Sequence, residues 1–272
     1  MNRLEYYNGE KHHEGFRIGA SGVSRFFTST SSWFRENMLG EDGFTGSTAS
    51  VLGTIVHGLL EAYVTKNPLP QSEIDEYLIS QSSIVPDLDV DYIHQQYPLM
   101  AAVAIEYLMY ELDESCVAER FIHKELLPGI HVGGSIDLHS SNSVTDYKTT
   151  SAKYPPKSIA YSWKLQLLTY AKLLIDEGHN IQYIRVLSIS TYVDGGISEK
   201  TGKPLKSYPP TVTVLEEAIT QDDLDMISGI HQVIAESVQT FRDSPAMRHL
   251  LAQDARLKGC SCIYTTPEEE EI

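Results

Sequence analysis

Apolar residues recur at helical spacing through most of the first 115 positions of the chain. This pattern predicts four helices, over residues 21–38, 51–66, 71–82 and 90–115. Two prolines, Pro68 and Pro70, end the second helix. Residues 1–20 are polar and are expected to be flexible, and residues 41–50 are rich in Gly, Ser and Thr, which predicts a loop.

The pattern changes after residue 115. Short apolar segments separated by turn residues predict an antiparallel meander of three strands, over residues 117–126, 131–139 and 143–148. Residues 158–177 carry the apolar stripe of a helix, and a buried strand is expected over residues 181–192. Because a helix joins it to the preceding strand, we expect the two strands to be parallel. The remaining elements are a strand over 211–215 and helices over 221–243 and 246–258.

The order of these elements predicts an α/β fold, with a mixed central sheet flanked by helices and an N-terminal helical cap. We expect one domain over residues 21–263. Its three parts are a helical part, a sheet core and C-terminal helices, over residues 21–115, 116–215 and 216–263. Residues 264–272 form an acidic tail.

Composition limits the function classes. The chain has 272 residues, of which 42% are hydrophobic and 21% charged, as in globular proteins. Its net charge is −16, so any contact with a polyanion must rely on a local basic surface. Three cysteines do not make a secreted disulfide framework, and the first fifteen residues hold no apolar run typical of a signal peptide. No segment reaches the ~18 apolar residues of a membrane span, so we expect a cytoplasmic protein that does not bind membranes.

The most informative segment is the pair of predicted strands that contain Asp137, Asp146 and Lys148. Side chains alternate across a strand, so Asp146 and Lys148 should point the same way, and the short turn should bring Asp137 beside them. Two close carboxylates repel each other unless a cation lies between them, and carboxylate oxygens suit Mg²⁺ or Mn²⁺. A lone Asp-x-Lys is also typical of a surface ion pair, so the interpretation depends on further residues.

Further polar residues occur at compatible positions. His57 and Glu61 lie one helical turn apart, as do Gln166 and Tyr170, so each pair shares a helix face. Glu119 lies on the strand before Asp137. Taken singly, each of these residues has a plain structural interpretation, as a helix histidine, a polar helix surface or an exposed strand glutamate.

Taken together, the order of these motifs along the chain resembles that of the RecB-type branch of the PD-(D/E)xK nuclease superfamily. This branch includes RecB nuclease domains and RecE-like and lambda-type exonucleases. The order is a serine-containing helix start at Ser21, a G-x-x-x-H-x-x-x-E helix, a G-x-x-D strand, a D-x-K strand and a Q-x-x-x-Y helix. The resemblance covers roughly residues 20–192 and implies a restriction-endonuclease-like core.

The resemblance also implies roles for individual residues. The metal ligands would be His57, Asp137, Asp146 and the carbonyl of Tyr147. Lys148 would be the catalytic lysine, and Gln166 and Tyr170 would position their helix and the DNA phosphate. Glu61 and Glu119 would act from outside the direct ligands or through water. The implied cofactor is Mg²⁺, for which Mn²⁺ would substitute.

Several relatives carry an iron–sulfur cluster on one cysteine before the core and three after it. This chain has only Cys116, Cys260 and Cys262, so we expect no cluster and interpret them as ordinary intracellular cysteines.

DNA binding by so acidic a chain requires a local basic surface. Residues 147–175 contain no Asp or Glu but five lysines, and aromatic residues lie between them. We therefore expect DNA contacts from Lys153, Lys157, Trp163 and Lys164. Lys200, Lys203 and Lys206 would extend this surface. The alternative is a solvated helix face with a structural tryptophan.

The sequence thus predicts a metal-dependent deoxyribonuclease, with the exonuclease activity and a role in recombination, repair or phage genome processing inherited from the resemblance. The expected partners are DNA, with ends or single-stranded, and a recombination or replication protein, in a bacterial or phage-infected cell. One alternative is a structure-specific or flap endonuclease of the same fold. Another is a catalytically silent, acidic DNA-mimic or partner protein, which the net charge of −16 favours.

Overall fold

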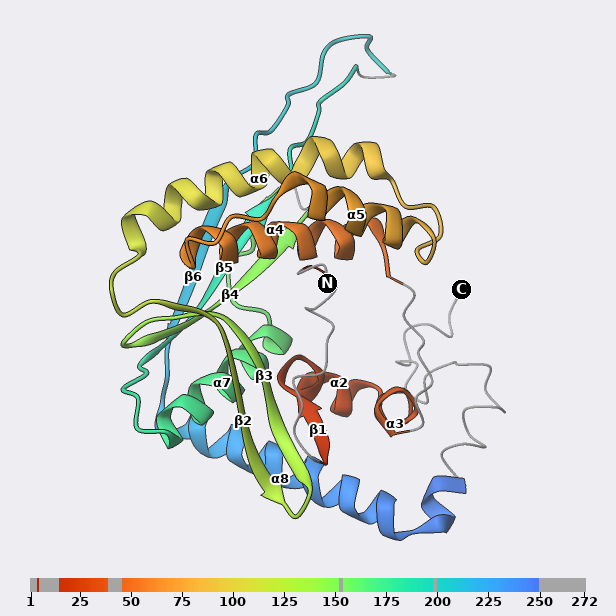
Figure 1. Cartoon of the computed structure of the whole chain (residues 1–272), viewed down its shortest axis with the longest axis vertical. Helices are drawn as coiled ribbons and strands as arrows, with labels where there is room; N and C mark the ends of the chain where they lie inside the picture. The colour runs from red at the N-terminus through yellow and green to blue at the C-terminus, as the bar shows by residue number, and fades with distance from the viewer. Residues whose placement is uncertain (1–3, 5–14, 39–45, 152–153, 198–199, 250–272) are drawn as a thin grey trace.

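A mixed sheet of six strands forms the centre of the molecule (Figure 1). The computed structural model describes residues 4, 15–38, 46–151, 154–197 and 200–249. The strands follow the order β1-β3-β4-β5-β6, and β2 pairs with the other edge of β3. Their bounds are β1 Phe16–Gly19, β2 Val117–Leu127, β3 Ile130–His139, β4 Ser143–Thr150, β5 Tyr183–Ser190 and β6 Val212–Ala218.

The strand directions confirm the predicted meander and crossover. β2 and β3 are antiparallel, as are β3 and β4. β4 and β5 are parallel, and helix α7, Tyr161–Asp176, joins them. The expected mixed sheet flanked by helices is therefore present.

Helices from the N-terminal half cover one face of the sheet, as the upper layer of Figure 1 shows. They are α4 Thr48–Val64, α5 Gln71–Ser82 and α6 Val90–Glu111. α4 begins three residues earlier than predicted because Ser47 and Ser50 form a reciprocal capping box that satisfies free N–H groups of the first turn. The apolar faces of α4 and α6 pack with Tyr147 and Leu187 of the sheet in one buried cluster.

The other face is covered by α7, by α8, Gln221–Asp243, and by short N-terminal elements. These are a 3₁₀ turn η1, Ala20–Gly22, then α2, Val23–Thr28, and α3, Thr30–Met38. The single helix predicted over residues 21–38 is therefore wrong, because Ser29 has the non-helical angles φ −154° and ψ 63°. The bend turns Phe26 and Trp33 into the same core, where their rings meet edge to face at 5.2 Å.

The N-terminal segment also differs from the prediction. Residues 16–19 were expected to be flexible, but they form β1, parallel to β3, and Ile18 is fully buried. At the other end, residues 245–249 are helical as predicted, whereas the rest of the expected helix over 246–258 and the acidic tail lie outside the described residues. Among the helices of the described ranges, none has the length and apolar character needed to cross a membrane.

Candidate active site

The sheet opens at the point where β3 changes partners. One edge of β3 pairs with β1 as far as Gly133 and with β4 only at Leu138 and His139. Over the described residues between these two ladders, from Gly134 to Asp137, this edge has no paired strand. Side chains rather than backbone groups therefore meet across the gap.

Asp137 lies at the edge of this gap and joins three elements. The backbone N–H of Tyr147 on β4 donates a hydrogen bond of 2.7 Å to Oδ2 of Asp137, so the carboxylate takes the place of a strand carbonyl. Nδ1 of His57, from α4, lies 3.4 Å from the same oxygen. The His57 ring packs edge-on against the ring of Tyr147, with centroids 5.6 Å apart. The helix motif and the first strand motif are therefore in direct contact.

Asp146 forms a second cluster, with the lysine that follows it on β4. Nζ of Lys148 lies 2.7 Å from Oδ2 of Asp146, which confirms that the two side chains point the same way. Gln166 of α7 donates from Nε2 to Oδ1 of Asp146 at 2.8 Å, and its Oε1 accepts from Nζ of Lys148 at 3.3 Å. Gln166 thus holds the carboxylate and the ammonium group in one fixed arrangement.

The two carboxyl groups have different electrostatic surroundings. Burial alone would raise the pKa of Asp137, but the charge and hydrogen bond of His57 and the N–H of Tyr147 hold it below its usual 3.8. Burial likewise opposes the charged form of His57, yet Asp137 raises the pKa of this ring above 6.5. For Asp146, burial and then the charge of Asp137 raise the pKa to about 6, despite the opposing effect of Lys148. Such a separation of two neighbouring carboxyl groups is typical of catalytic sites.

Tyr170 closes the gap from the α7 side. A Cβ atom on Gly134 would lie 2.8 Å from the Tyr170 hydroxyl, so only glycine fits here without a shift. Burial, followed by the charges of Asp137 and Asp146, raises the pKa of Tyr170 and keeps its hydroxyl protonated. Gln166 and Tyr170 therefore both reach the sheet opening from one helix face, as their spacing predicted.

Glu119 lies on β2 in the position opposite Asp137, between the pairs Ala118–Leu138 and Arg120–Ile136. Its φ angle of +52° is in the left-handed region, which costs a non-glycine residue roughly 1–2 kcal/mol. After burial and Asp137, the charge of Glu119 contributes to the raised pKa of Tyr147. Strained backbone next to a charged cluster is common at functional sites.

Glu61 is not brought into these clusters. It lies one turn beyond His57 on α4 and is half-buried. Within the described part of the chain, no hydrogen bond or ion pair joins its carboxylate to Asp137 or Asp146. Its expected role near the metal therefore stays a prediction.

The residues expected to bind DNA have varied surroundings. Lys157 is exposed, and Trp163 is half-buried and packs against the core. Lys164 lies 3.1 Å from a carboxylate oxygen of Glu217 on β6 and 3.0 Å from one of Asp223 on α8. The stretch without acids in the sequence is therefore not free of acids in space. Lys153 lies outside the described residues.

The donor groups suit a hard divalent cation in chemical type. The carboxylate of Asp146 is buried and its Oδ2 lies 2.7 Å from Nζ of Lys148, so a cation bound here would share this oxygen with the ammonium group. However, no three His, Cys, Asp or Glu side chains in the described ranges lie close enough together to hold a metal ion. Asp137 faces His57, whereas Asp146 faces Lys148 and Gln166, so the expected cluster of three ligands is not assembled here.

The sequence pattern did not identify two glycines of the site, each of which lies close to a side chain from another element. Gly134 makes room for Tyr170, and a Cβ atom on Gly53 would lie 3.2 Å from the Thr149 hydroxyl oxygen. Both are the first residues of motifs, G-x-x-x-H and G-x-x-D. The motif glycines were a usable signal, since glycine is common where a backbone approaches a neighbour closely.

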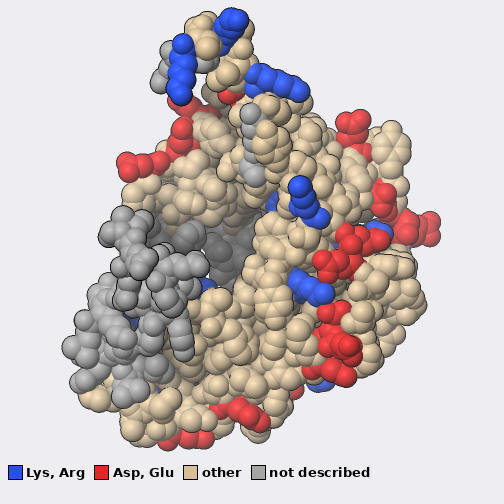
Figure 2. All heavy atoms as spheres, turned by 180° about the vertical axis from the view of Figure 1, so that it is seen from behind, with Lys and Arg blue, Asp and Glu red and all other residues tan. Residues whose placement is uncertain are grey.

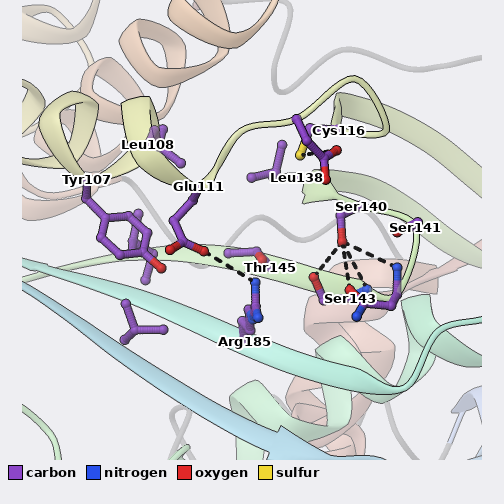
Figure 3. Close-up of a pocket in the computed structure, with 14 residues that line it drawn as sticks. Tyr107, Leu108, Glu111, Cys116, Leu138, Ser140, Ser141, Ser143, Thr145 and Arg185 are labelled. Atoms are coloured by element: carbon purple, nitrogen blue, oxygen red, sulfur yellow. Dashed lines mark hydrogen bonds and ion pairs between the residues drawn. The ribbon is translucent and has the colours of Figure 1, made fainter.

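A cavity of about 260 Å³ lies elsewhere, beneath the end of α6 (Figure 3). Its lining includes Leu138 and Thr145, each next in sequence to a carboxylate of the site, and the free thiol of Cys116. Cys260 and Cys262 lie outside the described residues. The lining contains none of the clustered residues, because successive strand side chains point to opposite faces. The cavity is therefore separate from the candidate active site.

Comparisons with known proteins place these motifs in a family. The sequence profile of the PD-(D/E)XK nuclease superfamily matches residues 17–257, which includes every element that contributes to the site. No curated protein sequence matches the chain significantly.

A solved structure shares the fold at low sequence identity. A protein of Eubacterium rectale, named as a proposed exonuclease, is 13% identical, with a TM-score of 0.55 and coverage of 92% of both chains. An alkaline exonuclease of Laribacter hongkongensis is 11% identical over 76% of this chain and 98% of its own. Its TM-score of 0.36 is too low to bear on the function.

Proposed function

The chain belongs to the PD-(D/E)XK nuclease superfamily, and from that premise we propose that it is a metal-dependent deoxyribonuclease that acts as an exonuclease. The exonuclease part is inherited from the family resemblance, in which the sequence from Asp146 to Thr150, D-Y-K-T-T, is similar to the D-x-K-T-T of RecE-like and RecB-like members. The proposed substrate is DNA with ends or single-stranded DNA. The proposed setting is recombination, repair or phage genome processing in the cytoplasm of a bacterial or phage-infected cell, with a recombination or replication protein as partner.

The observation that carries this proposal is the pair of ion-paired clusters at the sheet opening. Asp137 with His57, and Asp146 with Lys148, come from three sequence motifs between residues 57 and 148, yet they meet in one gap. An ordinary surface ion pair does not explain a buried carboxyl group with a pKa of about 6 beside a second carboxylate. Metal-assisted phosphodiester hydrolysis uses carboxylates that hold the cation and a positive group that stabilises charge developing on the phosphate. Both kinds of group are present at this opening.

Each residue has a separate role in this proposal. Lys148 places a positive charge where negative charge develops on the phosphate, and Gln166 holds that ammonium group in position. Tyr170, protonated at neutral pH, offers a hydrogen-bond donor at the same opening. The strand N–H of Tyr147 fixes the Asp137 carboxylate.

A divalent cation would be held by Asp137 and Asp146, with His57 and the Tyr147 carbonyl as further donors. When bound, Mg²⁺ or Mn²⁺ would lower the pKa of a coordinated water and offset charge on the phosphate. The donor set, two carboxylates and an imidazole nitrogen, supports this role by its chemistry.

The test is degradation of end-labelled linear DNA and of covalently closed circular DNA, each with Mg²⁺ or with EDTA. We expect loss of label from linear DNA only, in Mg²⁺ only. The matched control is Asp137→Asn, which keeps the side-chain shape and should be inactive. Full activity in EDTA, or in Asp137→Asn, contradicts the proposed mechanism.

Two alternatives give different results in the same assay. Cleavage of the circular substrate would indicate an endonuclease, including a flap-specific one. Absence of cleavage with retained DNA or protein binding would indicate a catalytically silent partner protein, the alternative suggested by the net charge of −16.

A further inference from the structure

A projecting arm extends from the sheet beyond the α4–α6 layer (Figure 1). We use "the arm" for residues 193–197 and 200–208, which follow β5. Two isolated bridges, Val193–Tyr208 and Ile197–Pro204, hold its two sides together. The first bridge has two backbone hydrogen bonds, of 2.9 and 2.8 Å. The arm is therefore a hairpin-like element.

The arm has a specified shape. A Cβ atom on Gly195 would lie 2.1 Å from the carbonyl oxygen of Leu205, so the two sides approach at a distance that only glycine permits. Near the root, the Asp194 carboxylate accepts hydrogen bonds from the Ser207 hydroxyl at 3.2 Å and from the N–H of Gly196 at 3.3 Å. These local contacts keep the two sides in register.

The root of the arm is fixed to the body by a buried side chain. Gln96 of α6 is only 3% exposed. Its Oε1 accepts from the N–H of Tyr192 at 2.7 Å, and its Nε2 donates to the carbonyl of the same residue at 3.2 Å. The direction in which the arm leaves the sheet is thus set by a satisfied buried amide.

The arm carries a concentration of positive charge that contrasts with the rest of the molecule. Lys200, Lys203 and Lys206 are all exposed, and Figure 2 shows blue side chains gathered on this projection. Nζ of Lys206 lies 5.3 Å from the centre of the Tyr208 ring. Asp194 is at the root, and Glu199 lies outside the described residues. A chain of net charge −16 thus presents three lysines on this projecting arm.

The arm begins close to the candidate active site. Ser188 of β5 is the register partner of Lys148, and the N–H of Thr191 donates to the carbonyl of Thr150 at 2.9 Å. From Ser188 to Lys200 an extended chain spans at most about 40 Å. One turn of duplex DNA is roughly 34 Å long, so the lysines lie within about one turn of the site.

We propose that the arm is a second DNA-binding element, whose lysines contact the phosphate backbone of a duplex within about one helical turn of the cleaved bond. This inference rests on the proposed nuclease function and specifies which residues supply electrostatic affinity for the DNA substrate. A polyanion fits the observations because three exposed positive charges lie close together on a chain whose net charge is −16. The lysines act through charge alone, and catalysis stays with Lys148.

The test compares the triple variant Lys200→Gln, Lys203→Gln and Lys206→Gln with a control of equal charge change. The control is Lys66→Gln, Lys124→Gln and Lys172→Gln, in which Lys66 lies at the end of α4 and the other two form ion pairs with Asp176. The affinity of each protein for duplexes of about 6 and about 20 base pairs is measured in EDTA between 50 and 200 mM salt.

We expect the arm variant to lose affinity for the long duplex only. If all three contacts form, the plot of log affinity against log salt concentration is shallower by roughly 2.7 for this variant than for the wild type. The factor by which the variant binds more weakly than the wild type should then be about 40-fold smaller at 200 mM than at 50 mM salt. The control should keep the wild-type slope, and turnover on the short duplex in Mg²⁺ should be unchanged in both variants.

Other outcomes separate the arm from the enzyme. Cleavage by the wild type together with an unchanged slope in the arm variant overturns the arm proposal and leaves the nuclease intact. A wild type that cleaves no DNA overturns the proposed function instead. Vesicles of phosphatidylserine that bind the wild type but not the arm variant, with equal DNA affinity of the two, would identify a membrane contact and reject the arm as a DNA element.

Discussion

Asp146→Asn should inactivate the protein and, in the absence of metal, make it more stable at alkaline pH. Asp146 is 3% exposed, and burial with the nearby charge of Asp137 raises its pKa from 3.8 to about 6. A carboxyl group whose pKa is higher in the folded state opposes folding when it is ionised. Asn removes this charge, keeps the shape and can still receive the hydrogen bond from Gln166.

The magnitude follows from the displacement of the pKa. A rise of about two units corresponds to roughly 3 kcal/mol of unfolding free energy, and this already includes the attraction of Lys148. The penalty is complete above pH 6, because the group is then ionised in both states, and it vanishes below 3.8, where both states are protonated. The variant should therefore be more stable by up to about 3 kcal/mol at pH 8 and by about 1 kcal/mol at pH 4.5.

Urea denaturation in EDTA, at several pH values between 8 and 4.5, measures this difference. Asp176→Asn is the matched control, because burial would raise the pKa of Asp176 but its bonds to Lys124 and Lys172 lower it below 3.8. The control should be less stable than the wild type at pH 8, by no more than about 1 kcal/mol, and this loss should stay nearly constant down to pH 4.5, because it fades only below 3.8. A less stable Asp146→Asn at pH 8 would refute the reasoning.

Three further changes test the remaining residues. Lys148→Ala should bind metal and DNA but cleave at least about 100-fold more slowly in single-turnover measurements; loss of DNA binding with normal cleavage at saturation would make it a phosphate anchor only. His57→Ala should lower activity and raise the Mn²⁺ concentration needed for half-maximal cleavage, whereas an unchanged requirement would leave His57 as a structural partner of Asp137. Lys157→Gln should flatten the salt dependence of DNA binding by about 0.9, while Lys164→Gln, already paired with Glu217 and Asp223, should leave it unchanged. Equal slopes for the two lysine variants would contradict this distinction.

The local pattern of the sequence was sufficient for most elements and for part of the site. Helical spacing located α5, α7 and α8, and alternation predicted that Asp146 and Lys148 share a face. The helix between two apolar strands also predicted that β4 and β5 are parallel. These features depend on periodicity and chain connectivity, which can be read along the chain.

Features that depend on partners distant in the sequence were decided by the tertiary structure. The bend at Ser29 and the strand β1 occur because Trp33 and Ile18 are buried against elements far along the chain. Likewise, the sequence around Lys164 does not indicate that its charge is paired with Glu217 and Asp223, which lie more than fifty residues later. Residues without local acids can therefore still have acidic neighbours.

The active-site arrangement shows the same division. The sequence by itself determined which residue types converge, because the order of the motifs and the strand alternation bring Asp137, Asp146, Lys148 and Gln166 to one opening. Only the tertiary structure decided how they pair, with His57 on Asp137 and Lys148 on Asp146. The reason is physical: pairing and pKa depend on distances of a few ångströms and on burial, which are set when the α4 and α7 layers pack against opposite faces of the sheet.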